Sequence, residues 1–430
     1  MENQKIDAAV IGAGPAGVSA AITLARAGKK VLLIERSDKA GDKNVFGGCI
    51  YAQQTSEIFP EFWKTAPVER RITEEKVIML TDTSSVDMSY RFNSKDIKAF
   101  TVLRSKWDRW CVEQAEKEGV YYAPKTLVKE LLKENGRITG FQTESEKFYA
   151  DIVIIADGVN SLLAKQIGLK EDFKDENMVL NVKEVWELPK DKLEDRFHID
   201  CETGVSAKIL GGPLKDMFAM GFMYTNKNSI SIGIGVSLDE LKKHKKNPSK
   251  LLDELKKHPS IAAYLKDAEF LEYSAHMIPE GSFNNIPKLY DSGVMTAGDA
   301  AGFVDNIHFE GTNLALLSGK LAAETAVYAL NKGDYSSETL SLYYEKLKNS
   351  IVFKDLRTHY NTIPVLKKNI KTITSLYPDL ACSFFDTLTN ADGMPKYDKY
   401  RNFAKKILSS GAVFKSIPLG LFALEKCLKK

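Results

Sequence analysis

The sequence predicts an α/β fold with three parts: a discontinuous domain on a parallel sheet, an antiparallel-sheet domain and a helical C-terminal region. Three observations predict it. A glycine-rich turn, "VIGAGPAG", follows an apolar run near the N-terminus, and a second small-residue turn, "TAGDAAGFVDN", comes only at residues 296 to 306. Between them, residues 175 to 290 lack the strand–helix alternation of a parallel sheet, so a second domain interrupts the first.

The first turn has the features of a Rossmann dinucleotide-binding unit. "DAAVIGAGPAGVSAAITLARAGKKVLLIER" is typical of strand, turn, helix and strand, with Gly12, Gly14 and Gly17 in G-x-G-x-x-G spacing. These glycines permit the tight turn, the close approach of a pyrophosphate and close helix–sheet packing, while the helix N–H groups face the phosphates. Glu35 ends the second strand, where it can accept hydrogen bonds from ribose hydroxyls. This motif predicts a dinucleotide without separating FAD from NAD.

The second turn favours FAD. "SGVMTAGDAAGFVDN" runs from an apolar strand to Asp299, flanked by Gly298 and Ala300, and then toward a helix, "TNLALLSGKLAAETAVYAL". FAD has a ribityl chain that NAD lacks, so one extended FAD can need both ends of the protein chain. Between the two turns, "ADIVIIADGVNSLLAKQIG" is a buried strand followed by Asp157 and Gly158, which could also be a simple turn with a helix-capping Asp.

These stretches, together with Arg104 at the start of the helix "TVLRSKWDRWCVEQAEKEGV", resemble the glutathione-reductase-like flavoproteins of the aromatic hydroxylase and geranylgeranyl reductase superfamily. Without the resemblance, Arg104 would be a solvated helix-start residue. The resemblance implies that the first motif binds the ADP half, that Asp157–Gly158 lies near the pyrophosphate and that Asp299 binds ribityl. The implied FAD contacts are Gly12, Gly14, Ala16, Gly17, Glu35, Arg36, Gly48, Arg104, Val128, Asp157, Gly158, Gly298, Asp299, Gly311, Thr312 and Asn313, the last three beside the flavin ring.

The domain boundaries follow from these motifs. We expect residues 1–170 and 290–335 to form the FAD-binding domain, 171–289 an antiparallel-sheet substrate or quinone domain, and 336–430 a helical region. "NMVLNVKEVWEL", "VSAKILGG", "MFAMGFMYTN" and "SISIGIGVSL" are typical of antiparallel strands that would cover the flavin. "LKKHKKNPSKLLDELKKHPSIAAYLKD" predicts a charged helical insertion with a solvated face.

Four patches resemble a narrower family, the FixC proteins, relatives of electron-transfer flavoprotein:quinone oxidoreductase: "KNVFGGCIYAQ", "GFMYTNKNSISIGIGVSL", "MIPEGSFNNIPKLYDSGVMTAGDAAGF" and "YPDLACSFFDTLTNADGMPK". The Tyr-x-Trp-x-Phe-Pro strand and Pro-x-Cys-Gly-Gly loop of geranylgeranyl reductases are not matched. The resemblance implies a flavoenzyme that passes electrons from an electron-transfer flavoprotein heterodimer to a quinone (menaquinone or ubiquinone), in some systems as the exergonic branch of electron bifurcation.

The number and spacing of the cysteines indicate whether an iron–sulfur cluster could lie in this chain or on a partner subunit. Larger single-chain relatives end in a four-cysteine [4Fe–4S] domain, whereas the five cysteines here are widely spaced and contain no C-x-x-C pair. The resemblance therefore implies a cluster on a separate ferredoxin-like FixX subunit, and we expect no metal in this chain. No nucleic-acid partner is expected, because no nucleic-acid-binding module accompanies the basic residues.

Flavin-to-quinone transfer needs positioning rather than a catalytic acid set. The flavin-proximal candidates are Gly47, Gly48, Cys49, Tyr51, Phe222 and Tyr224. The two glycines would let backbone approach the flavin, or only form a tight turn, and the three aromatics could line a quinone slot or belong to the core. Cys49 is more simply an inert thiol. His308 could donate a proton to reduced quinone, although a surface histidine is the simpler interpretation.

The distribution of charge and the hydropathy of the sequence predict where in the cell the protein acts. The 430-residue chain has a net charge of +3, yet residues 396 to 430 carry +7, which leaves −4 for the remainder. No apolar run long enough to span a bilayer and no secretory signal are found. Because a prenylated quinone lies in the bilayer, "FKSIPLGLFALEKCLKK" and "IPVLKKNIKTITSLYP" are candidates for membrane contact; the alternative is that both pack on the body. We expect a cytoplasmic protein, peripheral on the inner face of the cell membrane.

Two other functions stay open. One is an NAD(P)H-dependent geranylgeranyl (prenyl) reductase or aromatic hydroxylase-like flavoenzyme. The other is a flavin-bearing structural subunit that only holds redox proteins together, which the match at both cofactor and cover segments disfavours.

Overall fold

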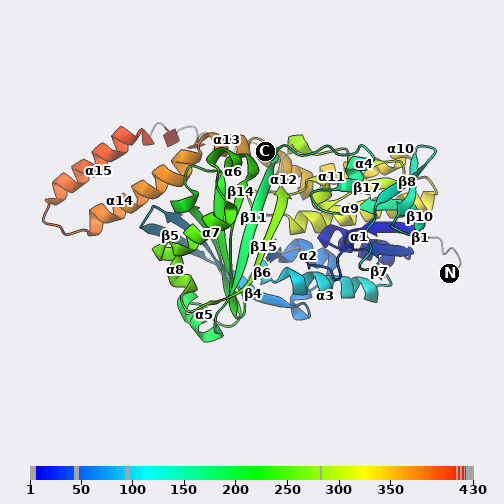
Figure 1. The fold of residues 1–430 in the computed structure, drawn as a ribbon, viewed down its shortest axis with the longest axis horizontal. Coiled ribbons are helices and arrows are strands. Elements are labelled where there is room, and N and C mark those ends of the chain that lie inside the picture. The colour runs from blue at the N-terminus through cyan, green and yellow to red at the C-terminus, as the bar shows by residue number, and fades with distance from the viewer. Residues whose placement is uncertain are drawn as a thin grey trace. The chain divides into compact units, whose positions relative to one another are not determined.

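The computed structural model describes residues 6–42, 48–92, 97–280, 283–412, 415–416, 419–420 and 422. The chain divides into two compact units, each assembled from three segments (Figure 1). Unit 1 comprises Met1–Arg71, Ile97–Val179 and His276–Tyr360, and unit 2 comprises Ile72–Asp96, Leu180–Ala275 and Asn361–Lys430. Strand β4 (Val68–Leu80) begins in unit 1 and ends in unit 2.

Unit 1 is built on a parallel sheet. Its strand order is β16-β17-β10-β1-β2-β7, parallel from β17 to β7, with β16 antiparallel at the edge. Val10 of β1 pairs with Ile154 of β10 on one side and with Leu33 of β2 on the other, and all three side chains are buried. Both faces of these central strands are covered, which explains the continuous apolar runs in the sequence. The strands are β1 (Ile6–Ile11), β2 (Val31–Ile34), β7 (Tyr121–Ala123), β10 (Lys147–Ile155), β16 (Tyr290–Asp291) and β17 (Val294–Thr296).

The helices of unit 1 bury a shared apolar core with this sheet. Helices α1 (Pro15–Arg26) and α9 (Thr312–Lys332) pack directly on each other although about three hundred residues separate them, and Ser19 Oγ donates to Leu316 O at 2.6 Å. The remaining elements are β3 (Cys49–Tyr51), α2 (Ala52–Ile58), β6 (Ala99–Val102), α3 (Arg104–Lys117), β8 (Glu130–Glu134), β9 (Arg137–Gln142), α4 (Leu162–Gln166), α10 (Ser337–Leu340), α11 (Leu342–Asn349) and α12 (Ile351–His359).

Residues 336–360 are part of unit 1, whereas the sequence analysis assigned them to the helical C-terminal region. The physical reason is apolar packing: the ring of Phe353 on α12 lies 6.0 Å from that of Phe303, and buried Tyr343 donates to Thr296 O at 2.9 Å. The three-domain division predicted from the sequence stays a prediction.

Unit 2 is built on an antiparallel sheet with the order β15-β11-β14-β13-β12-β4, and β5 pairs with β4. Antiparallel registers include Ala207↔Met223 and Met223↔Ile232, whose side chains are buried in the second core. The strands are β5 (Ser85–Arg91), β11 (Met178–Glu187), β12 (Thr203–Gly211), β13 (Ala219–Thr225), β14 (Ser229–Ser237) and β15 (Glu269–Pro279). The predicted α/β class, with one parallel and one antiparallel sheet, is confirmed.

The charged insertion is helical, as predicted. It forms α6 (Leu238–His244), α7 (Pro248–Lys257) and α8 (Pro259–Leu265), which follow α5 (Lys190–Phe197) in unit 2. Lys250 and Lys257 of α7 are exposed, and Lys256 is half-buried and pairs with Glu184 at 2.7 Å. Leu251, Leu252 and Leu255 on the same helix are fully buried in the core. Asn247 caps α7 by accepting from Lys250 N, which explains why the helix begins there.

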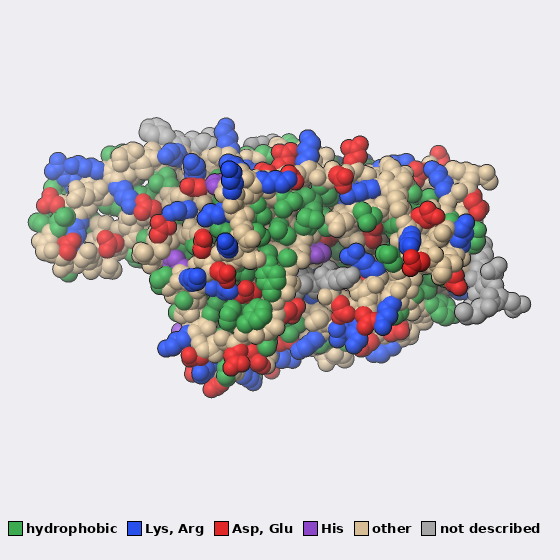
Figure 2. All heavy atoms as spheres, viewed as in Figure 1, with side chains coloured by type: hydrophobic (Ala, Val, Ile, Leu, Met, Phe, Trp, Pro, Cys, Tyr) green, Lys and Arg blue, Asp and Glu red, His purple; other side chains and the backbone are tan. Residues whose placement is uncertain are grey.

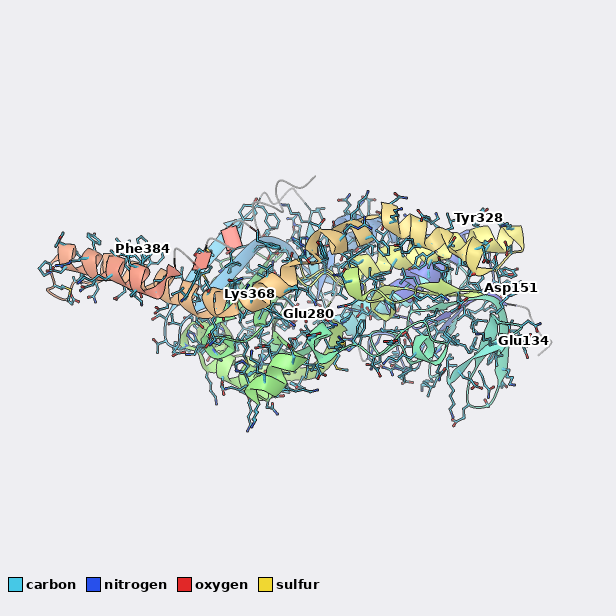
Figure 3. All side chains as sticks on the ribbon, turned by 90° about the horizontal axis from the view of Figure 1, so that it is seen from above. Glu134, Asp151, Glu280, Tyr328, Lys368 and Phe384 are labelled. Carbon is cyan, nitrogen blue, oxygen red and sulfur yellow. The ribbon has the colours of Figure 1, made fainter. Side chains whose placement is uncertain are left out.

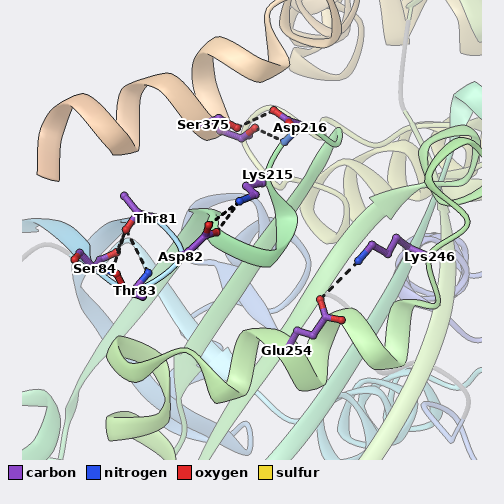
Figure 4. Close-up of polar contacts among 10 residues, drawn as sticks. Thr81, Asp82, Thr83, Ser84, Lys215, Asp216, Lys246, Glu254 and Ser375 are labelled. Atoms are coloured by element: carbon purple, nitrogen blue, oxygen red, sulfur yellow. Dashed lines mark hydrogen bonds and ion pairs between the residues drawn. The ribbon is translucent and has the colours of Figure 1, made fainter. Parts of the chain in front are cut away.

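The C-terminal helices belong to unit 2 and confirm the predicted helical region: α13 (Thr362–Lys368), the π-helix η6 (Thr372–Leu376), α14 (Tyr377–Thr389) and α15 (Lys396–Ser410). Polar contacts at η6 attach them to the sheet domain (Figure 4). Ser375 Oγ donates to Asp216 Oδ1 at 2.8 Å, and Asp216 N donates to Thr374 Oγ1 at 3.0 Å. Lys215, next to Asp216, pairs with Asp82 at 2.7 Å. In the described part of the chain, no helix is long and apolar enough to cross a bilayer.

Candidate functional site

The turn after β1 requires glycine at two positions. Gly12 has φ +105°, and a Cβ there would lie 2.2 Å from Ala156 O. A Cβ at Gly17 would lie 1.8 Å from Gly12 O. No side chain could occupy either place without moving backbone, so the first and third glycines of the motif hold strand β1, the turn and helix α1 at close distance.

Helix α1 presents its N-terminus to this turn. Gly14 is the N-cap, with an ordinary φ of −75°, and Pro15 occupies the first turn. No side chain caps the helix, so the first N–H groups are left to water or to a ligand, at the positive end of the helix dipole. This geometry suits a phosphate, as the sequence motif predicts.

Glu35 follows the carboxyl end of β2 and is fixed by backbone. Its Oε2 accepts from Ala13 N at 3.1 Å and its Oε1 accepts from Ser37 N at 2.8 Å. Each oxygen keeps a further lone pair, so the carboxylate is oriented toward the glycine turn and can still accept hydroxyl donors. The next residue, Arg36, is exposed.

Asp157 follows β10, is half-buried and is incompletely paired. Its Oδ1 has no hydrogen-bond partner in the described structure, and burial raises the pKa of the carboxyl. Gly158 has φ +82°, which glycine adopts easily. An orphaned buried acceptor costs free energy, so Asp157 is placed for a donor that the protein itself does not supply.

Asp299 follows β17, the last parallel strand. Gly298 has φ +65°, and a Cβ there would lie 2.8 Å from the Cβ of Ala16 on α1, so only glycine lets the loop reach this depth. The Asp299 carboxylate makes no hydrogen bond within the described part of the chain, and burial raises its pKa. The nearby charges of His276, Arg104 and Lys170 oppose that rise.

Lys170 donates hydrogen bonds to the loop after Asp157 and to the loop of Asp299, and the sequence did not predict this. Its Nζ donates to Val159 O at 2.8 Å and to Ala300 O at 3.1 Å, and it lies 4.3 Å from the Phe173 ring. The residue is buried, and burial lowers the pKa of its amine to about 8. It therefore fixes the loop of Asp157 against that of Asp299. No local motif marks Lys170, because both partners lie in other segments.

His276, near the end of β15, was also missed. Burial lowers the pKa of its imidazole, the Asp299 charge opposes this, and the Arg104 and Arg36 charges add to it. The mutual influence of His276 and Asp299 places both in one electrostatic environment within unit 1. Its sequence neighbourhood, "SAHMIPE", has no ligand spacing that could have identified it.

Arg104 is not a solvated residue. Its Nε and a terminal nitrogen donate to Asp108 Oδ1 and Oδ2 at 2.7 and 2.8 Å, and both side chains are buried. The Asp108 charge raises the pKa of Arg104 against the effect of burial. The four-residue helical spacing of this pair was visible in the sequence and would have predicted it.

The turn before α9 holds a second incompletely paired side chain. Gly311 is the N-cap of α9, and Thr312 and Asn313 form its buried first turn without any side-chain cap. Asn313 Nδ2 donates to Glu310 Oε2 at 2.6 Å, while Asn313 Oδ1 has no partner in the described structure. The turn thus offers helix N–H groups and an amide oxygen to a ligand.

The other predicted residues fall into both units. Gly48 and Cys49 lie in unit 1 at β3, beside Tyr51, whose hydroxyl donates to His308 O at 3.3 Å. Phe222 and Tyr224 lie on one face of β13 in unit 2, with stacked rings 5.2 Å apart. Gly47 and Cys427 are outside the described residues, and Val128 lies in a core cluster.

The loops of unit 1 converge because of sheet topology. Gly12, Glu35, Asp157 and Asp299 each follow the carboxyl end of a parallel strand, and these ends lie at one edge of the sheet. In open α/β sheets, ligands bind at this edge. The acceptors without a donor fit the hydroxyl groups of a dinucleotide, and the helix N-termini without a side-chain cap fit its phosphates. The glycine turns let the backbone come close to such a ligand. The fold and these loops define a dinucleotide-binding protein of the Rossmann type.

Comparisons with known proteins give the family. Residues 5–347 match the family model described as FAD binding domain. The chain is 39% identical to the probable electron transfer flavoprotein-quinone oxidoreductase YdiS of Escherichia coli, over 92% of this chain and 93% of that protein. It is 37% identical to Protein FixC of Bradyrhizobium diazoefficiens, over 95% and 96% of the two chains. The chain therefore belongs to the FixC family of FAD-binding flavoproteins.

Solved structures confirm the fold. A geranylgeranyl bacteriochlorophyll reductase-like protein from Thermoplasma acidophilum has a TM-score of 0.72 at 19% identity, covering 94% of this chain and 99% of its own. The flavin-dependent brominase Bmp2 has a TM-score of 0.68 at 16% identity, covering 95% and 100%. At these identities the likeness concerns the fold alone.

Proposed function

We propose that this flavoenzyme takes electrons from an electron-transfer flavoprotein and passes them to a quinone, menaquinone or ubiquinone. The observation that carries the proposal is the similarity to FixC and YdiS over more than nine-tenths of both chains, which includes unit 2 as well as the cofactor domain. Partners of the FixC type would be the two electron-transfer flavoprotein subunits and a ferredoxin-like FixX subunit with a [4Fe–4S] cluster. Such a complex could form the exergonic branch of electron bifurcation.

FAD supplies the chemistry, because its flavin accepts and donates electrons singly or in pairs. The proposed ADP contacts are the α1 N-terminus and Glu35, whose fixed carboxylate would accept from the ribose. Asp157 would meet donors near the pyrophosphate, and Asp299 would accept from the ribityl hydroxyls. The N-terminus of α9, with Asn313, would face the flavin ring. Asp157 Oδ1 and Asn313 Oδ1 are acceptors that the described residues leave without a donor. Glu35 already accepts two backbone N–H groups and would accept the ribose donors in addition.

Quinone recognition is proposed for flat aromatic surfaces. Phe222 and Tyr224 form one stacked face on β13, and Gly233 on the neighbouring strand makes room for it, since a Cβ there would lie 2.3 Å from the Phe222 ring. Tyr51 in unit 1 is the third aromatic candidate from the sequence. A stacked pair of this kind suits a planar, apolar ring.

Membrane contact is proposed for the hairpin of α14 and α15. Of the two segments predicted for this role, the first lies largely outside the described residues, and the second forms α13 and η6, where Ile363, Thr372 and Thr374 are buried. The hairpin instead exposes large apolar side chains beside basic ones, as the Lys and Arg atoms in Figure 2 and Phe384 in Figure 3 show. The exposed apolar set is Phe384, Phe385, Leu388, Met394, Tyr397, Tyr400 and Leu408.

Anaerobic flavin spectra test the function. The purified protein receives NADH, NADPH and then reduced electron-transfer flavoprotein in turn, followed by a soluble menaquinone analogue. We expect bleaching only with the reduced flavoprotein and recovery of the flavin colour with quinone. Rapid bleaching by a nicotinamide alone would contradict the proposal and favour the prenyl reductase or hydroxylase alternative.

A further inference from the structure

A cluster of metal-ligand side chains lies in unit 1, and two of its three residues lie in the chain between Asp299 and the Gly311 turn, both of which are assigned to FAD. Asp305 and His308 come from the loop between β17 and α9, and His359 is the last residue of α12. The Asp305 Oδ2 lies 3.0 Å from His308 Nδ1 and 3.9 Å from His359 Nε2, and the three ligand atoms lie within 4.8 Å of one another. The two imidazole rings are 4.7 Å apart.

These distances between ligand atoms are close to the distances between the ligand atoms of a bound cation. Metal–ligand bonds of about 2.0–2.2 Å place neighbouring donors roughly 3 to 3.5 Å apart. The Asp305–His308 pair already has this spacing, whereas His359, at 3.9 Å from Asp305 Oδ2 and within 4.8 Å of both ligand atoms, would have to move closer on metal binding. Two imidazoles and one carboxylate are a donor set that suits first-row divalent cations and leaves coordination positions open.

The carboxylate is held in place by the backbone. Asp305 is buried, and its Oδ1 accepts from Ile307 N at 2.8 Å and from His308 N at 3.3 Å. The loop itself is closed by reciprocal backbone hydrogen bonds between Asp305 and Glu310, at 2.7 and 2.9 Å. One oxygen is therefore used for positioning, while Oδ2 faces the two rings. Such supporting hydrogen bonds are what a metal ligand needs.

The surrounding charge favours a cation. Asp355, one helical turn before His359, and Glu310 both border the cluster. With Asp305 they place three carboxylates in one cluster, and their like charges repel one another. A divalent cation would relieve that repulsion. His308 is 53% exposed, so the cluster is open to ions from solvent.

We propose that Asp305, His308 and His359 bind a divalent first-row transition cation, with Zn²⁺ as the simplest occupant. The proposal departs from the sequence-based expectation of no metal in this chain. It does not depend on the proposed electron route, because it concerns only the geometry of this cluster. The competing state is a hydrogen-bonded cluster that never binds metal.

Calorimetric titration tests the site. The FAD-loaded protein is stripped of metal with a chelator, exchanged into chelator-free buffer and titrated with Zn²⁺. We expect one Zn²⁺ per chain with micromolar or tighter affinity, and at least tenfold weaker binding in His308→Gln and in His359→Gln. The control is His244→Gln, because His244 lies 3.2 Å from Glu240 in a histidine–carboxylate pair that has no second imidazole nearby in the described structure.

The outcomes are distinct. Binding that survives in His244→Gln and is weakened in both other variants, with FAD content unchanged in all of them, supports the site. Wild-type protein that takes up no Zn²⁺, or equal affinity in all three variants, would overturn it. His308→Gln changes an exposed side chain, so this variant keeps the test decisive even if the half-buried His359 were needed for folding.

Discussion

Asp299 shows how a single residue can link strand geometry to cofactor retention. Its carboxylate lies at the end of β17, where burial disfavours its charge and no group in the described chain donates to it. A ligand hydroxyl would supply the missing donor. We expect Asp299→Ala to weaken FAD binding at least tenfold, since a hydrogen bond to a charged group contributes about 1.5–3 kcal/mol. FAD content after gel filtration and a fluorescence titration measure this.

A matched control is Asp172→Asn, because Asp172 is an exposed carboxylate paired with Lys165 and has no role assigned in FAD binding. Full FAD occupancy and unchanged affinity in Asp299→Ala would contradict the role assigned to Asp299.

Lys170 predicts a pH dependence of stability. Burial lowers its pKa to about 8, below the ordinary lysine value of about 10.4. Between these values the unfolded chain holds the proton more often than the folded one, so this group makes the protein more stable as pH rises from about 8 toward 10. We expect Lys170→Met to lack that increment, and to bind FAD more weakly because two loop contacts are lost.

Urea unfolding of wild type and variant at pH values between about 7 and 9.5 measures the difference. Lys129→Met is the control, since Lys129 is exposed and paired only at the surface with Glu144 among the described residues. If Lys170→Met and wild type show parallel pH curves, Lys170 is not desolvated as the structure indicates.

At the scale of elements, the crossing of α1 and α9 is the contact that joins the two ends of the FAD domain. A Cβ at Gly319 on α9 would lie 2.0 Å from Ala16 O on α1. We expect Gly319→Ala to separate the helices and to destabilise the protein by about 1–3 kcal/mol, with weaker FAD retention, since both helices begin at the site. Thermal unfolding with and without added FAD measures both effects.

Gly420→Ala serves as the control for that substitution, because a Cβ there meets no atom of the described residues within 4 Å. A Gly319→Ala protein as stable as Gly420→Ala would show that the helices have room to adjust.

The element scale also shows what sequence can and cannot predict. The parallel sheet and the places of Gly12, Glu35, Asp157 and Asp299 were predictable, because glycine turns after apolar strands fix loops at carboxyl ends. The antiparallel strands and terminal helices were predictable from their periodicity. Lys170 and His276 were not, because their neighbours in space come from distant segments and leave no local pattern.

At the scale of the whole molecule, charge and exposed apolar surface bear on location. We expect binding to vesicles that contain phosphatidylglycerol, weakened by salt, because the C-terminal region is strongly basic. The double substitution Phe384→Ser and Phe385→Ser should reduce this binding several-fold, since two exposed rings of α14 are lost. Co-sedimentation with vesicles measures it.

Tyr328→Ser is the control, because Tyr328 on α9 is 50% exposed, as is Phe385, and lies in unit 1 (Figure 3). Equal loss of vesicle binding in both proteins would contradict a specific role for the hairpin.

The three-segment construction of each unit has a consequence for biosynthesis. Strand β17, which pairs with β10, is synthesised about 140 residues after it, and helix α9 follows later still. At roughly 5–20 residues per second, the nascent chain spends on the order of ten seconds with an unfinished sheet edge before the cofactor site can close. Flavin capture must therefore wait until β17 and α9 have been synthesised. In flavin-starved cells we expect this chain to remain with chaperones for longer than a protein whose cofactor domain is continuous.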